Sequence, residues 1–241
     1  MTNPALKMSP QERQQRSAEK RAAVLGFLAS GEQWSTLTVL SELLRTSERN
    51  ALRLLQKLNE EKLIKVDDRV LPHLRLKLYG ITDHGLAVVG ADVDMKAFAI
   101  GRTNPSFVQH HLESQLVRIR AEQTGWSNWT PGKVLFTDNS TRLKKLPDSL
   151  ANRPDGRRVA VEIERFVKSP KRLTDVVGLH LQQIVAGKYD LVYYFTPHPE
   201  AQMRAFNKIQ FVTMENQKVK LNDSHRARFK VFNLSEWKGE M

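Results

Sequence analysis

The 241-residue sequence contains no cysteine, which excludes disulfide bonds and zinc sites built from thiolate ligands. It also lacks an apolar run of about 18 residues, the length that a helix needs to cross a bilayer, so we expect no membrane insertion. The first part of the chain is polar and lacks the apolar centre of a secretory signal, so a cytoplasmic location is expected.

Positive charge is what the sequence has in excess. There are 38 Lys and Arg residues against 26 Asp and Glu residues, a formal net charge of +12. A surplus of this size commonly marks a surface that faces phosphate groups. Residues 1–95 carry an excess of only +2, whereas residues 96–241 carry +10. A basic groove, if present, is therefore expected mostly in the C-terminal part.

Three short helices and a β-ribbon are predicted in the first part of the chain. Apolar residues at helical spacing predict helices at about 17–31 and 36–44, and a third helix follows Thr46 and Ser47, either of which can cap it. Two strands and a short closing helix fit residues 62–90. This pattern, with a "YGITDHG" segment after the ribbon, resembles the winged helix-turn-helix fold.

The third predicted helix has an apolar face formed by Ala51, Leu54, Leu55 and Leu58. Polar and basic residues occupy its other face, where a recognition helix contacts base edges or phosphates. The alternative is that these are ordinary solvated positions, because many winged helices bind proteins instead of DNA. The DNA-binding candidates are Arg49, Asn50, Arg53 and Lys57 on the helix, and Arg69, Arg75 and Lys77 in the wing.

The second part of the chain predicts an α/β domain with a mixed sheet. Its expected elements are an amphipathic helix from Phe107, strands at 133–137, 145–151 and 157–166, a helix at 169–188, a strand at 189–197, a further helix, and strands in the tail. We therefore expect an α+β protein with a flexible polar segment at 1–16, a winged helix-turn-helix domain at 17–95, a linker at 96–105 and the α/β domain at 106–241.

An acidic hairpin is the main candidate site of this domain. Pro154-Asp155-Gly156 fits a three-residue turn, and with Arg153 paired to Arg157 the numbers of opposed residues sum to 310. Asp148 is then opposite Glu162, with Cβ atoms roughly 5 Å apart.

Strand alternation places Glu164 on the same face as Glu162. Three clustered carboxylates repel one another unless a cation lies among them, and Mg²⁺ is a natural candidate. The alternative is a solvated hairpin rim neutralised by nearby basic residues, namely Arg157, Arg158, Arg165 and Lys168.

The pair Pro147-Asp148, followed after thirteen residues by Glu162-Ile163-Glu164, resembles the PD-(D/E)xK nuclease superfamily. The resemblance implies a restriction-endonuclease-like core in which a helix precedes a three-stranded meander, a helix and a strand. Glu164 departs from the motif because lysine is usual there, although some restriction enzymes of the superfamily carry Glu. Lys168 or Lys171 could supply the missing cation.

The combination of a winged helix, His110 or His111 with Glu113, the PD pair and the ExE triplet resembles the MobC relaxases and related replication-relaxation proteins. The resemblance implies an enzyme that nicks one strand of duplex plasmid DNA at a transfer origin, with relaxosome accessory and coupling proteins as further partners. The implied metal ion is Mg²⁺ or Mn²⁺. The implied ligands are Asp148, Glu162 and Glu113, with Glu164 as ligand or general base and with His110 and Lys168 as further catalytic groups.

The aromatic residues of the second part allow two other interpretations. Tyr193 and Tyr194 invite a covalent tyrosine mechanism, but "LVYYF" predicts a strand with at least one ring in the core, and Trp126 and Trp129 are either base-stacking or packed on their own domain. The alternative to a relaxase is a non-catalytic DNA-binding accessory protein or transcriptional regulator with a degenerate nuclease domain.

Overall fold

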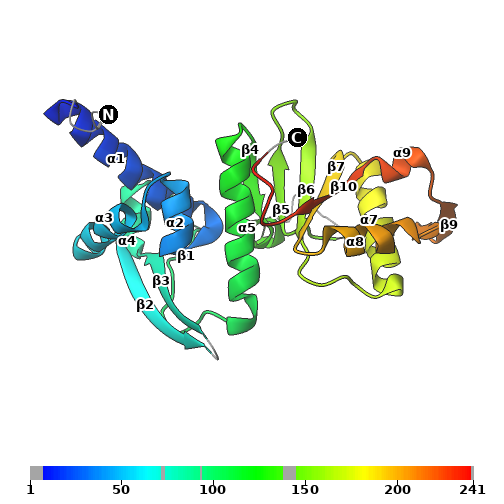
Figure 1. Ribbon diagram of the computed structural model, residues 1–241, viewed down its shortest axis with the longest axis horizontal. Helices are drawn as coiled ribbons and strands as arrows, with labels where there is room; N and C mark the ends of the chain where they lie inside the picture. The colour runs from blue at the N-terminus through cyan, green and yellow to red at the C-terminus, as the bar shows by residue number, and fades with distance from the viewer. Residues whose placement is uncertain (1–7, 72–73, 93, 138–144, 240–241) are drawn as a thin grey trace. The chain divides into compact units, whose positions relative to one another are not determined.

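The computed structural model describes residues 8–71, 74–92, 94–137 and 145–239 (Figure 1). The fold is mixed α+β, with two compact units, Met1–Leu112 and Glu113–Met241. They divide inside α5 (Pro105–Gln123), later in the chain than the linker expected at 96–105. The physical reason is that Val108 of α5 packs with Phe98 and Trp34 in one buried cluster of the first unit.

The first unit contains three α-helices, a three-stranded antiparallel sheet whose first strand precedes the second of these helices, and a short closing helix. The strand order is β1-β3-β2, and β2 and β3 form the long hairpin predicted as the wing (Figure 1). This order of elements is the one expected of a winged helix-turn-helix. The elements are α1 (Pro10–Phe27), η2 (Leu28–Glu32), β1 (Trp34–Thr36), α2 (Leu37–Leu43), α3 (Glu48–Glu60), β2 (Ile64–Leu71), β3 (Leu74–Ile81) and α4 (Asp83–Val88).

Two features of this unit differ from the expectation. α1 begins at Pro10, because Ser9 and Glu12 form a reciprocal capping box, so the flexible segment expected at 1–16 is helical from residue 10. Residues 1–7 lie outside the described part of the chain. The strand β1 was missed because three residues are too few to show an alternating pattern.

The predicted apolar face of α3 is confirmed. Ala51, Leu55 and Leu58 are fully buried, and Leu54 is partly buried. Ser47 occupies the N-cap position, although its side chain makes no capping hydrogen bond. The packing of these leucines fixes which side of α3 remains exposed.

The second unit is built on a five-stranded mixed sheet with the order β10-β7-β6-β5-β4. The strands β4, β5 and β6 form an antiparallel meander, and β6, β7 and β10 are parallel. Along the chain, a helix precedes the meander, and a helix and a parallel strand follow it. The elements are β4 (Ser127–Pro131), α6 (Gly132–Thr137), β5 (Ser149–Asn152), β6 (Arg158–Ile163), α7 (Pro170–Val185), β7 (Leu191–Thr196), α8 (Pro199–Asn207), β8 (Phe211–Met214), β9 (Gln217–Lys220), α9 (Asp223–Arg226) and β10 (Phe229–Asn233).

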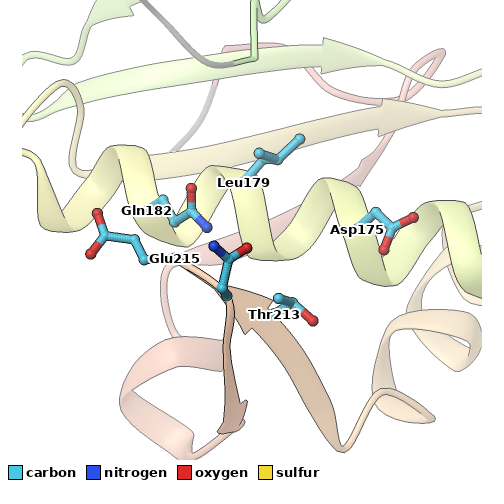
Figure 2. A pocket seen from close by; sticks show the side chains of 6 residues that line it. Asp175, Leu179, Gln182, Thr213 and Glu215 are labelled. Atoms are coloured by element: carbon cyan, nitrogen blue, oxygen red, sulfur yellow. The ribbon is translucent and has the colours of Figure 1, made fainter.

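A small hairpin, β8–β9, packs against α7 in this unit (Figure 2). The approach is close at Gly178, where an added Cβ would lie 2.6 Å from the carbonyl oxygen of Thr213. Beside the hairpin is an open pocket of about 560 Å³. Its lining residues are Asp175, Leu179, Gln182, Thr213, Glu215 and Asn216.

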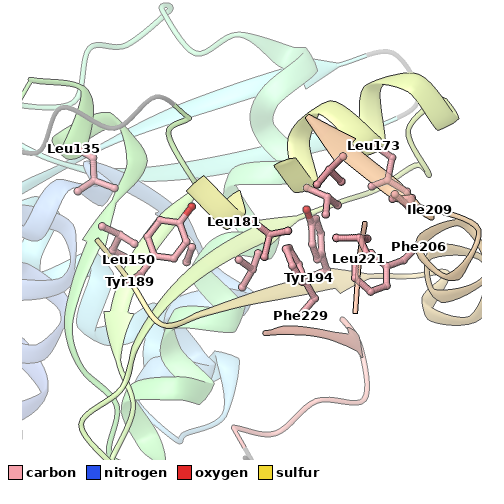
Figure 3. Packing of buried hydrophobic residues seen from close by; sticks show 14 residues of the cluster. Leu135, Leu150, Leu173, Leu181, Tyr189, Tyr194, Phe206, Ile209, Leu221 and Phe229 are labelled. Atoms are coloured by element: carbon pink, nitrogen blue, oxygen red, sulfur yellow. The ribbon is translucent and has the colours of Figure 1, made fainter. Parts of the chain in front are cut away.

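Both faces of the sheet are buried. One face packs against α5 through Val117 and Ala121, and the other packs against α7 and α8 in the cluster that Figure 3 shows. Along β6, Ala160 faces the α7 cluster while Val159 and Val161 face the other cluster, as the period of two requires. The central strand β6 is therefore covered on both sides.

Three expectations about this unit were wrong in detail. Residues 133–137 form α6 and not a strand, and the first strand of the meander is β4 instead. α5 already begins at Pro105, and Phe107, expected on its apolar stripe, is 65% exposed.

No helix in the described ranges is both long and apolar enough to span a lipid bilayer.

Candidate functional site

The hairpin between β5 and β6 has the predicted register. Ser149 is opposite Val161 and Asn152 is opposite Arg158, so opposed residue numbers sum to 310. The turn closes as expected, with Gly156 at a φ of 84° and its N–H donating to the carbonyl of Arg153 over 2.9 Å. Asp148, one residue before β5, consequently lies beside the end of β6.

Asp148 is held by hydrogen bonds from three other residues. Its Oδ2 accepts the backbone N–H of Ile163 over 2.7 Å, and its carbonyl oxygen accepts both the N–H of Gly132 and the hydroxyl of Ser149, each over 2.7 Å. At Gly132, an added Cβ would lie 2.6 Å from the carbonyl oxygen of Pro147. A glycine at the start of α6 thus lets this helix lie directly against the Pro147-Asp148 backbone.

Glu162 is a buried carboxylate that contacts two possible hydrogen-bond donors. It is 5% exposed, its Oε1 is ion-paired with Lys145, and the Nε2 of His180 lies 3.3 Å from the same oxygen. Burial alone would raise the pKa of Glu162, but the contact with His180 and the positive charge of Lys145 lower it to about 2. Glu162 is therefore ionised at neutral pH.

His180 is oriented from behind by Tyr189. The Nδ1 of His180 lies 2.7 Å from the hydroxyl of Tyr189, and burial raises the pKa of Tyr189, which therefore stays protonated. Burial also lowers the pKa of His180, so the ring is neutral at pH 7. With Tyr189 donating to Nδ1, the ring proton is on Nε2, toward Glu162, and Lys145 supplies the positive charge there.

The remaining predicted carboxylates are engaged in ion pairs. Glu164 follows the end of β6 and is paired with Lys168, and Glu113 of α5 lies 3.7 Å from Arg165. Burial lowers the pKa of Lys168. Arg165 and Lys168, two of the four cations expected to neutralise a solvated rim, are thus paired with Glu113 and Glu164. Glu162 instead contacts Lys145 and His180.

Within the described part of the chain, no group of three or more His, Asp or Glu side chains is arranged to hold a metal ion. The implied ligand set of Asp148, Glu162 and Glu113 stays a prediction. In chemistry it suits Mg²⁺ or Mn²⁺, which are hard cations with oxygen ligands, and Glu162 is an ionised oxygen donor next to Asp148. Metal binding would require Lys145 and Arg165 to release their carboxylates.

The other chemistry candidates are placed as follows. His110 belongs to the first compact unit and Glu113 is the first residue of the second, so their joint role also stays a prediction. Tyr193 and Tyr194 are each 1% exposed, and the hydroxyl of Tyr193 accepts a hydrogen bond from Arg153 over 2.6 Å. Burial raises the pKa of both tyrosines, which disfavours a tyrosine nucleophile.

Trp126 and Trp129 are buried, 4% and 8% exposed, against the sheet of their own unit. This packing agrees with the second of the two interpretations of these residues. Neither ring is open to a nucleotide base.

The exposed face of α3 carries all four helix candidates, because Arg49, Asn50, Arg53 and Lys57 are solvent-exposed. The wing differs, because its arginines are engaged within the protein. The Nε of Arg69 lies 2.9 Å from the buried Asp67, and Arg75 makes a two-pronged contact with Asp68 at 3.1 and 3.0 Å. The third wing candidate, Lys77, is exposed.

Three residues at the carboxylate site were missed from the sequence, namely Lys145, His180 and Tyr189. His180 had a usable signal, because it shares a helical face with Leu173, Val177 and Leu181 and should therefore point to the sheet. Lys145 had no comparable signal, since it precedes Asp148 in a segment without regular structure.

Comparison with known proteins gives little. No protein-family model matches the chain, and no curated protein is detectably similar. Among solved structures, a mutant of Lactococcus lactis ZitR in apo form is 26% identical, with 33% of this chain and 58% of that chain covered and a TM-score of 0.27. A mutant of MepR from a multidrug-resistant S. aureus clinical isolate is 18% identical, with 48% and 88% covered and a TM-score of 0.28.

The chain thus spans 58% of the length of the ZitR chain that it matches. With TM-scores this low, neither likeness shows the fold or the function of the present protein. The winged helix-turn-helix assignment rests instead on the element order and sheet topology of the first unit.

Lowering the pH is expected to destabilise the protein in two steps. Because burial lowers the pKa of His180 in the folded state, the unfolded chain binds more protons below pH 6.5, and the free energy of unfolding falls from there. The lowered pKa of Glu162 adds a second loss below pH 4.5. Urea denaturation across this range measures both steps. In His180→Asn the loss of stability between about pH 7 and pH 5 should be smaller than in the unmodified protein. If the two proteins lose the same free energy of unfolding over this range, His180 is not the group responsible.

Gly132→Ala is expected to destabilise the protein by about 1–3 kcal/mol, because the new methyl group would overlap the carbonyl of Pro147. Gly26→Ala is the matched control, since Gly26 lies within α1 with no atom inside 4 Å of its added Cβ. That control should gain about 0.5–1 kcal/mol. Thermal unfolding of both variants is the measurement, and equal melting temperatures would count against the close contact at Gly132.

Proposed function

We propose that the protein binds duplex DNA through its first unit, with α3 as the recognition helix. The observation that carries this proposal is the division of α3 into two faces. Ala51, Leu55 and Leu58 are buried, whereas Arg53 and Lys57 are exposed on the other side together with Arg49 and Asn50. A winged helix presents this face to the major groove.

The chemistry of the exposed face suits DNA. Arginine donates two parallel hydrogen bonds to guanine or to phosphate, and asparagine can do the same with adenine. The net charge of +12 favours encounter with a polyanion. In the wing, Lys77 is available for phosphate, while Arg75 would have to exchange Asp68 for it. DNA binding by this unit would serve either transcriptional regulation or an accessory role at a plasmid origin.

Arg53→Ala is expected to weaken binding to a labelled duplex about tenfold, since one arginine contact with a base contributes about 1–3 kcal/mol. Lys57→Ala should lower affinity and reduce the dependence of log affinity on log salt concentration by about one phosphate contact. Fluorescence anisotropy titrations at several salt concentrations measure both effects.

The control is Lys208→Ala, which removes an exposed cation at the end of α8 in the second unit. It should leave the duplex affinity within about twofold of the unmodified protein, since only a weak, screened charge effect is expected. If Arg53→Ala and Lys57→Ala bind as the unmodified protein does, α3 is not the recognition helix.

A second candidate function is metal-dependent cleavage of a phosphodiester bond in the second unit. The observation that favours it is the contact of the Asp148 carboxylate with the N–H of Ile163, which sets Asp148 beside the ionised Glu162 at the end of β6. The end of α5, the strands β4, β5 and β6 with α6 between the first two, then α7 and the parallel strand β7 follow one another in this unit, and apart from α6 this is the order that the nuclease resemblance implies.

In this proposal Asp148, Glu162 and Glu113 would hold Mg²⁺ or Mn²⁺, which as a Lewis acid polarises the phosphate and activates the attacking nucleophile. After releasing Glu162 to the metal ion, Lys145 would remain near it as the cation that the lysine of the usual motif would otherwise provide. Glu164 would then accept the proton of the attacking nucleophile once Lys168 had moved from Glu164 to a phosphate oxygen. The finer form of the proposal is a relaxase that nicks one strand at a plasmid transfer origin.

Asp148→Asn and Glu162→Gln are each expected to abolish nicking of supercoiled plasmid carrying a candidate origin in the presence of Mn²⁺, because both remove a charged oxygen ligand. Conversion of supercoiled to open-circular plasmid on agarose gels is the measurement. Asp175→Asn is the control, because Asp175 lines the separate pocket beside β8–β9. Nicking that survives both site changes would refute the catalytic proposal. If the unmodified protein binds duplex DNA but does not nick it, the catalytic proposal is also refuted and only the DNA-binding proposal stands.

A further inference from the structure

Phe166 is an aromatic residue in an unusual setting. It lies in the connection between β6 and α7, two residues after Glu164, and it is 72% exposed. The large aromatic rings of the sheet in the same unit are buried, including Tyr193, Tyr194 and Phe195. Isolated exposed apolar side chains are common on proteins, so the surroundings of Phe166 decide what its exposure means.

Several cations are close to Phe166 in the sequence, and one of them lies over its ring. The guanidinium carbon of Arg165 lies 5.7 Å from the centre of the Phe166 ring. With most of the ring open to solvent, a planar group can still stack on it. Phe166 is thus a ring whose surface is open and whose neighbours are positively charged.

Two further cations follow at the start of α7. Lys171 and Arg172 are exposed, and among the described residues neither forms an ion pair. They differ in this from Arg165 and Lys168, whose charges are engaged by Glu113 and Glu164. The connection therefore offers an open aromatic ring and, five and six residues later, two available cations.

We propose that this connection binds unpaired nucleotides of a nucleic acid strand, with a base stacked on Phe166 and backbone phosphates held by Lys171 and Arg172. An aromatic platform beside cations is how proteins bind single strands, because every unpaired base has a free face. Bases inside a duplex have no such face. The chain from Phe166 to Arg172 reaches at most about 20 Å, so the ring and the cations can contact the same short stretch of one strand.

This inference deepens the proposed nucleic-acid function, and it identifies a strand with unpaired nucleotides as the ligand of the second unit. Phe166 is close in sequence to Glu162 and Glu164, so a bound strand would lie next to the candidate carboxylate site. A protein partner with an acidic, apolar segment is the competing occupant, and the choice of variant separates the two. Leucine retains apolar contact at this position but offers no aromatic ring.

The test measures binding of the full chain to fluorescein-labelled oligothymidylate of about 12 nucleotides, within the usual site sizes, in EDTA so that no cleavage occurs. Phe166→Leu is expected to weaken binding about fivefold or more, whereas Phe166→Trp, which keeps an aromatic ring, should bind about as tightly as the unmodified protein. Lys171→Ala with Arg172→Ala should weaken binding and lower the salt dependence by about 0.7 per phosphate contact. Val185→Ala is the control, because Val185 is an exposed apolar residue, 78% exposed, at the other end of α7.

Absence of binding by the unmodified protein, or equal affinity of Phe166→Leu and the unmodified protein, would overturn the inference. Duplex binding is measured in parallel with Arg53→Ala. If Arg53→Ala leaves duplex binding unchanged while Phe166→Leu weakens single-strand binding, only the proposal for α3 is refuted. The reverse result would refute only the proposal for Phe166.

Discussion

The pairing of β5 with β6 is the constraint on which the candidate site of the second unit depends. The three-residue turn at Gly156 determines the register, and the register places Asp148 against the N–H of Ile163. A shift by one residue would move Glu162 to the opposite face of the sheet, among Trp126 and Trp129 and away from His180. Such a slip would leave a carboxylate without a donor in an apolar core, a cost of several kcal/mol that selects the observed register.

An ionised group in the middle of a sheet needs an explanation, because replacing a buried ion pair with apolar residues is often neutral or stabilising. Ala160, two residues before Glu162 on the same face, shows that this part of the sheet can be packed with apolar atoms alone. Lys145, His180 and Tyr189 instead form a chain of polar contacts around Glu162. Arrangements of this kind concentrate at functional sites, and for this reason we propose a chemical role for Glu162.

The features predicted correctly from the sequence were those set by local rules. The turn chemistry at Gly156, the alternation along β6 and the apolar face of α3 each depend on neighbouring residues, and each was confirmed. The helix α6 was predicted as a strand because its identity depends on a distant contact, the close packing of Gly132 on Pro147. Lys145 was missed for the same reason, since its partner Glu162 is 17 residues away and no periodic pattern connects them.

The excess of charge along the sequence does not show which cations are open to a polyanion. The excess of +10 in residues 96–241 suggested a groove there. However, Lys145, Arg165 and Lys168 are all paired with carboxylates. The first unit has an excess of only +2, yet α3 presents its cations to solvent. Exposed charge attracts a polyanion, whereas paired charge must first exchange its partner. This difference is why we propose α3 for the capture of duplex DNA and the exposed Lys171 and Arg172, and not the paired cations, for holding a strand on the second unit.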